Sequence, residues 1–94
     1  MAKNKPTAHL TFRGEKREVS LGNSVLYQIE KDGIDLRNLE GDPKVVTNVL
    51  KIGYHLLRVK EPFEDVLDDL PTPRQIGEAL ELLNAEPGEP EGDG

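Results

Sequence analysis

Cysteine and tryptophan are both absent from this chain of 94 residues. Without cysteine the chain can form no disulfide, no thiolate metal site and no cysteine nucleophile, and this composition suits a reducing compartment. Aromatic residues make up 4% of the sequence and hydrophobic residues 35%, so a core must be built mainly from Leu, Val and Ile. A chain of this length has room for one small domain of modest stability.

A basic face is also lacking. The formal net charge is −6. The C-terminal segment EPGEPEGDG carries four acids and no base: Glu86, Glu89, Glu91 and Asp93. The other residues then carry only −2 of the −6, so neither part offers the cationic surface that phosphate contacts need. We therefore expect no nucleic-acid partner.

Long apolar runs are missing too. No segment approaches the roughly 20 apolar residues of a membrane-spanning helix. The first ten residues, MAKNKPTAHL, hold two lysines but no apolar core of a signal peptide. We expect a soluble, cytoplasmic protein with no membrane partner.

The common motifs of catalysis are absent: there is no phosphate-binding loop, no dinucleotide fingerprint, no H-E-x-x-H and no G-x-S-x-G. The two histidines, His9 and His55, are too few for most histidine metal sites, and we expect ordinary surface or boundary residues. The acids of EPFEDVLDD lack the glycine and the spacing of a calcium loop and are expected to form a solvated helix face. The sequence thus predicts no enzyme, no metal and no cofactor.

Two short runs near the N-terminus alternate between apolar and polar residues. Leu10 and Phe12 share one face of AHLTFR, and Val19 and Leu21 share one face of REVSL. A short link containing glycine joins the two runs, which predicts a β-hairpin over residues 8–21. An isolated hairpin is marginal in water, so its apolar face must pack on helices.

The period then changes to that of a helix over residues 24–32. Asn23 or Ser24 is available as its N-cap, and Gly33 suits the position after its end, because glycine adopts the left-handed conformation at little cost. A short apolar stretch follows, for which Asp35 is the expected cap.

The strongest helix pattern covers residues 43–59. Asp42 stands where an N-cap belongs and Pro43 where the first helical residue belongs. Two adjacent apolar stripes run along this helix, and a face of that width suits a central helix with more than one neighbour. The first stripe consists of Val45, Val49, Ile52, Leu56 and Val59, and the second of Val46, Leu50, Gly53 and Leu57.

Two further helices are expected, over residues 63–70 and 73–84. The second has Thr72 as N-cap and Gln75 three residues later, the pattern of a capping box. Residues 85–94 contain only Ala, Glu, Pro, Gly and Asp, so we expect a disordered acidic tail.

Together these patterns predict one α+β domain over residues 8–84, with an N-terminal β-hairpin packed on three to four helices. Residues 1–7 are expected to be flexible.

The wide apolar face of the central helix has two interpretations. In the first it is core, covered by the hairpin and the flanking helices. In the second, part of it stays open as a protein-binding groove or as a surface that pairs with a second copy of the chain. The candidate binding residues are then Val45, Val49, Ile52 and Leu56.

The order of these elements resembles the small tail assembly chaperones of long-tailed bacteriophages and of related gene-transfer particles. The resemblance covers roughly residues 8–84. It is a likeness of pattern, carried by the segments LTFRGEKREVSL, SVLYQIEKDGIDLRNL, VVTNVLKIGYHLL, EPFEDVLDDL and PRQIGEALELL.

That resemblance implies a protein partner and no enzymatic activity. The chaperone would bind the long, helical tape measure protein before the tail tube polymerises around it. In such families a frameshift near the end of the gene often adds an extension that recruits tail tube subunits, and the gene usually lies just before that of the tape measure protein.

Two other classes of protein are alternatives to this interpretation. A structural component of a virion or another multiprotein assembly would use the same apolar surface for permanent subunit contacts. A small antitoxin or transcription regulator would need a basic DNA-reading element, whereas the most basic segment, RGEKRE, holds three bases and two acids and resembles a hairpin turn.

Overall fold

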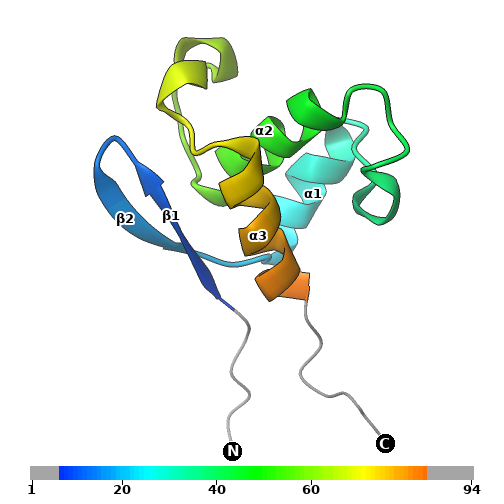
Figure 1. Ribbon diagram of the computed structural model, residues 1–94, viewed down its shortest axis with the longest axis horizontal. Helices are drawn as coiled ribbons and strands as arrows, with labels where there is room; N and C mark the ends of the chain where they lie inside the picture. The colour runs from blue at the N-terminus through cyan, green and yellow to red at the C-terminus, as the bar shows by residue number, and fades with distance from the viewer. Residues whose placement is uncertain (1–6, 85–94) are drawn as a thin grey trace, which may run out of the picture.

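The computed structural model describes residues 7–84. An antiparallel hairpin at the N-terminus packs with three helices (Figure 1), so the predicted α+β class is confirmed. The predicted acidic tail and most of the predicted flexible N-terminus lie outside the described residues. In chain order the elements are β1 (Ala8–Phe12), β2 (Glu15–Val19), α1 (Asn23–Lys31), η1 (Leu36–Asn38), α2 (Val45–Leu56), η2 (Phe63–Asp65), η3 (Leu67–Asp69) and α3 (Pro73–Asn84), where η marks a short 3₁₀ turn.

The predicted hairpin is present, but its second strand begins at Glu15 and ends at Val19, two residues before the predicted limit at Leu21. Ala8 pairs with Val19 at the open end, and Phe12 pairs with Glu15 beside the turn. Arg13 and Gly14 form the turn with φ angles of 54° and 78°. Positive φ at both positions is what a two-residue type I′ turn requires. The residues that face inward, Ala8, Leu10, Phe12 and Val19, are all buried, and β1 lies against α3.

Gly33 ends α1 as its sequence position predicts. Its φ is 79°, its N–H donates to the carbonyl of Glu30 at 2.9 Å, and the N–H of Ile34 donates to the carbonyl of Ile29 at 3.2 Å. This pair of bonds is a Schellman motif. Ile29 and Ile34 are both buried, so the motif also directs the following chain back onto the core.

The helix starts agree with the sequence at α3 but not at α1. Thr72 Oγ1 accepts from the N–H of Gln75 at 3.2 Å, and Gln75 Oε1 accepts from the N–H of Thr72 at 3.1 Å. The predicted capping box is therefore confirmed. At α1 the capping position is Gly22, and no side chain bonds there. Asn23 and Ser24, the predicted caps, lie inside the first turn.

The central helix begins two residues later than predicted. It starts at Val45 with Lys44 at the cap position. Asp42 accepts instead from the N–H of Lys44 at 2.8 Å, and its carbonyl accepts from the N–H of Val45 at 3.0 Å. Asp42 therefore closes a separate turn before the helix, a role common for aspartate.

The same helix ends before its predicted limit at residue 59. Arg58 has a φ of 54°. Its N–H donates to the backbone carbonyl of His55 at 3.0 Å, and the N–H of Val59 donates to the backbone carbonyl of Tyr54 at 3.4 Å. These bonds form a second Schellman motif with arginine where glycine is usual. Left-handed backbone at Arg58 is incompatible with a further helical turn, so α2 ends at Leu56.

The predicted helix over residues 63–70 is wrong. This segment forms two 3₁₀ turns, η2 and η3, separated by Val66, whose backbone has φ −114° and ψ 9°. Val66 and Leu70 are buried, whereas Leu67 is exposed. Two apolar anchors hold this acidic segment against the domain, and they do not supply the continuous buried face that would stabilise an α-helix.

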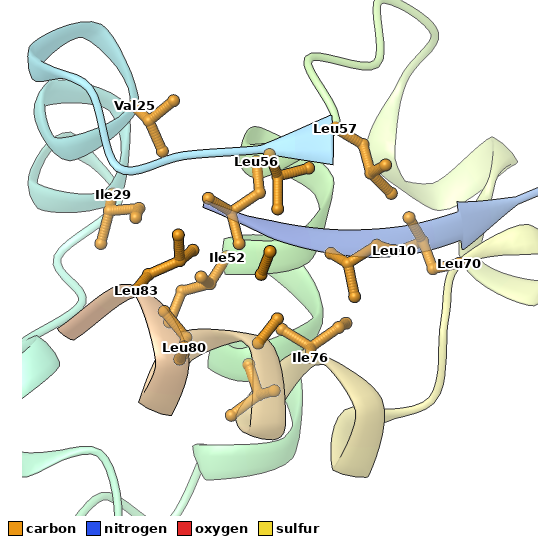
Figure 2. Close-up of a cluster of buried hydrophobic side chains, with 14 of the residues drawn as sticks. Leu10, Val25, Ile29, Ile52, Leu56, Leu57, Leu70, Ile76, Leu80 and Leu83 are labelled. Atoms are coloured by element: carbon orange, nitrogen blue, oxygen red, sulfur yellow. The ribbon is translucent and has the colours of Figure 1, made fainter. Parts of the chain in front are cut away.

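The core lies between the hairpin and the three helices (Figure 2), and α2 and α3 approach closely at Gly53. A methyl group placed on Gly53 would lie 2.8 Å from Cγ1 of Ile76. Ile76 is fully buried and cannot move toward solvent. Glycine at this position in α2 is therefore what allows α3 to cover the centre of the core.

Candidate functional site

The structure separates the four predicted binding residues into two pairs. Ile52 and Leu56 are 0% and 3% exposed and belong to the core, because α2 packs against both α1 and α3 there. The prediction of a binding surface at these two positions is thereby corrected. Val49 is 9% exposed and also belongs to the core, but it lines an open groove together with Val45, which is half-buried.

This groove, which we call the η1–α3 groove, lies between η1, the first half of α2, and α3. Its volume is about 790 Å³. Its apolar lining comes from all three elements and consists of Leu36, Leu39, Val45, Val49, Gly77 and Leu80. Its polar lining consists of Arg37, Asn38, Glu40, Arg74, Glu78 and Glu81.

The wall formed by η1 is anchored at both of its ends. At one end Ile34 is buried, and the side chain of Asp35 accepts from the N–H of Arg37 at 2.9 Å, as the sequence predicts. At the other end Asp42 accepts from Nδ2 of Asn48, a buried side chain of α2, at 3.2 Å. The connection between α1 and α2 is thus fixed where it leaves and rejoins the core, and it stands as one side of the groove.

The charges of the groove are mixed, with an excess of acid. Nε of Arg74 lies 3.6 Å from Oε2 of Glu78, which is one turn further along α3, and both side chains are highly exposed. Among the described residues no ion pair engages the other charged groups, Arg37, Glu40 and Glu81. An apolar floor with a charged, solvated rim is typical of surfaces that bind another protein.

A second polar cluster joins α1 to α2. Nε2 of His55 lies 2.7 Å from Oδ2 of Asp32, and the guanidinium of Arg58 donates to Oγ of Ser24 at 3.3 Å. Serine, histidine and aspartate are the residue types of a hydrolase triad, but that chemistry needs the hydroxyl bonded to the imidazole. Within residues 7–84 no hydrogen bond links Ser24 to His55. In this arrangement the cluster holds two helices together.

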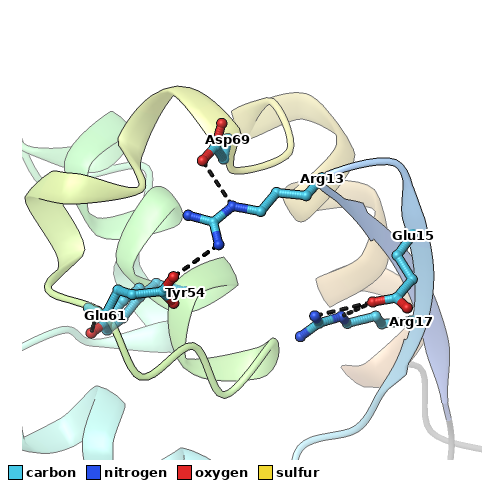
Figure 3. A network of polar contacts seen from close by, with 6 residues as sticks. All are labelled: Arg13, Glu15, Arg17, Tyr54, Glu61 and Asp69. Atoms are coloured by element: carbon cyan, nitrogen blue, oxygen red, sulfur yellow. Dashed lines mark hydrogen bonds and ion pairs between the residues drawn. The ribbon is translucent and has the colours of Figure 1, made fainter.

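A third cluster surrounds Arg13 at the tip of the hairpin (Figure 3). Its guanidinium donates to Glu61 at 2.8 Å and to Asp69 at 2.9 Å, and the hydroxyl of Tyr54 donates to the carbonyl of Glu61 at 2.6 Å. The hydrogen bond from Arg13 lowers the pKa of Glu61, and the two carboxylates raise the pKa of Arg13. These groups tie the hairpin turn to the segment that follows α2.

The described part of the chain holds neither a cluster of metal ligands nor a membrane-spanning helix. Over residues 7–84, no three His, Asp or Glu side chains gather as a set of metal ligands. In the same residues, none of the helices combines the length and the apolar character needed to cross a membrane.

Comparison with known proteins yields no relative: no protein-family model, no curated protein and no solved structure matches this chain. The resemblance to tail assembly chaperones therefore stays a prediction. The function has to be argued from the η1–α3 groove.

Proposed function

We propose that this chain is a non-enzymatic tail assembly chaperone that binds the tape measure protein of a long-tailed bacteriophage, or of a related gene-transfer particle, before the tail tube polymerises. The observation that carries this proposal is the η1–α3 groove. Its floor is the edge of the core at Val49 and Leu80, its half-buried apolar residues are Leu36, Leu39 and Val45, and it is open to solvent.

The groove suits an amphipathic helix. Its α3 wall extends from Arg74 to Glu81, which at 1.5 Å per residue corresponds to about 10 Å, or two helical turns. Helices that bind in grooves use apolar residues at positions i, i+3 or i+4, and i+7, which together span the same length. A long helical client presents many such segments.

The charge of the chain supports a chaperone role. A protein that binds a client before assembly protects it only while the complex stays soluble. The net charge of −6 opposes association between complexes. Binding of the chaperone to the unaggregated client also shifts the equilibrium of the client away from aggregates by mass action.

The experiment is co-expression with the candidate client, which would be a long, helix-rich protein encoded by a neighbouring gene. We expect more of that protein to remain soluble, and we expect the two proteins to copurify. Val45→Glu places a charge in the groove lining and should abolish both effects. Val46→Glu is the matched control, because the next residue of the same helix is 57% exposed and does not line the groove.

Two results would contradict the proposal. One is an equal loss of copurification in both valine variants, which would place the contact elsewhere. The other is failure of the wild-type chain to keep the client soluble, combined with recovery of the chain from finished particles. That second result would identify a structural component of the assembly instead.

A further inference from the structure

Two glycines stand inside helices of 12 residues, Gly53 in α2 and Gly77 in α3. Glycine is among the least favourable residues in a helix interior, and neither of these two has a positive φ. Each position therefore needs a reason. At Gly53 the reason lies within the chain, because Ile76 occupies the space in which a methyl group would stand.

Gly77 has no such reason among the described residues. A Cβ atom built on Gly77 would have no heavy atom of another part of the chain within 4 Å. The residue is half-buried, and it lines the η1–α3 groove. Along this side of the groove the surface at Gly77 is bare backbone.

We propose that Gly77 is a socket in which an apolar side chain of a partner helix packs against the backbone of α3, in the way that Ile76 packs against Gly53. The proposal rests on the function proposed above and specifies how the client is held. Small residues at helix contacts let two backbones approach closely, and a methyl group at such a contact is enough to cause overpacking.

The surroundings of the socket define the partner. Branched side chains of Leu36, Val45 and Leu80 line the same groove, so the inserted residue is aliphatic. Within the described part of the chain, the rim charges engaged in no ion pair are Arg37, Glu40 and Glu81, so acidic groups outnumber the basic one. The partner is therefore an α-helical segment with an aliphatic stripe and with Lys or Arg beside it.

Gly77→Ala tests the socket, because stability and binding should change in opposite directions. Alanine restores helix propensity in open space, so the melting temperature should rise by about 4 °C or more. The added methyl group occupies the socket, so affinity should fall about tenfold or more. The probe is a set of overlapping peptides of about 30 residues that together cover the candidate client named above, and affinity is measured by fluorescence anisotropy.

Three variants complete the experiment. Gly53→Ala should lower the melting temperature without changing the affinity of the folded fraction, because Gly53 lies outside the groove. Gly77→Leu should abolish binding. Glu81→Lys should weaken the binding of cationic peptides, and this loss should shrink at high salt. If no single peptide binds, the same variants are scored by copurification with the full-length client.

Several results would overturn the socket. If Gly77→Ala and Gly77→Leu both bind the client with unchanged affinity, the socket proposed at Gly77 is wrong, whereas the proposed chaperone function is unaffected. A wild-type dimer that Gly77→Leu converts to a monomer would show that a second copy fills the groove. Absence of any client binding by the wild-type chain, in peptides and in co-expression, would overturn both proposals.

Discussion

Arg13 and Glu61 are 48 residues apart in the chain, and the guanidinium of the first donates to the carboxylate of the second at 2.8 Å. The bond connects the hairpin turn to the segment that follows α2, and it lowers the pKa of Glu61 from its ordinary value of 4.5. Both side chains are about half exposed, so the contribution to stability is small and is best detected through its pH dependence.

A carboxylate with a lowered pKa stabilises the fold above the pKa that it has in the unfolded chain. That contribution is lost as the pH falls through the lower value of the folded state. Glu61→Gln removes the titration, so the difference in stability between wild type and variant should shrink as the pH falls below the ordinary pKa of glutamate and through the lower pKa of the folded state. Urea denaturation over this range measures it. A difference independent of pH would show that Glu61 acts through packing alone.

Gly53→Ala should destabilise the protein. Overpacking costs about 1–3 kcal/mol, and the gain in helix propensity is about 1 kcal/mol. Ile76 is fully buried and cannot yield, so the cost should lie toward the upper end of that range, and we expect a net loss of up to about 2 kcal/mol.

The double variant Gly53→Ala with Ile76→Val provides the control for this prediction. Valine lacks the Cδ1 atom that would meet the new methyl group, so the double variant should be more stable than the two single losses predict. Unfolding by urea gives all three values. Simple additivity would show that the contact with Ile76 is not the source of the strain.

Arg58→Gly should stabilise the protein by about 0.5–1 kcal/mol. Left-handed backbone costs a non-glycine residue about 1–2 kcal/mol, and the greater freedom of glycine in the unfolded chain offsets part of the gain. Arg58→Ala removes the bond to Ser24 but keeps the backbone cost, and it should not stabilise. Melting temperatures of the two variants separate the effects, and equal changes in both would assign the effect to the side chain.

Thr72→Ala should cost about 1 kcal/mol, because it removes the side-chain acceptor that closes the capping box of α3. Asn23→Ala is the matched control at the start of α1, where the helix has no side-chain cap, and it should change stability by less than about 0.5 kcal/mol. The comparison is made by urea denaturation. An equal loss in both variants would mean that the capping bonds of Thr72 contribute little.

Several local signals were predicted correctly from the sequence, although the caps expected at the starts of α1 and α2 were not. The hairpin follows from alternation, the stop at Gly33 follows from the left-handed conformation of glycine, and the bonds between Thr72 and Gln75 follow from their spacing. Each of these features depends on residues that are close together in the chain. The prediction of a helix over residues 63–70 was wrong, because the helical spacing of apolar residues does not show whether the rest of the chain will cover that face.

The candidate site was only partly predictable. The helical spacing of apolar residues identified Val45 and Val49 as candidate binding residues, but it identified Ile52 and Leu56 equally. Only the position of α3 shows which of these residues line the groove. The contact between Asp32 and His55 spans 23 residues and leaves no local pattern. Nothing in the sequence indicated a role for Gly77, because the open space beside this glycine is visible only once the surrounding elements are placed in three dimensions.

The wall formed by η1 is fixed at its two ends, and between them only Leu36 and Leu39 pack against the core. Arg37, Asn38 and Glu40 are exposed, so substitutions at these three positions can change the shape and charge of the groove while the core packing stays intact. If the proposed client binds in this groove, selection for a different client could act on a few neighbouring codons, and the fold would accept most of the resulting changes.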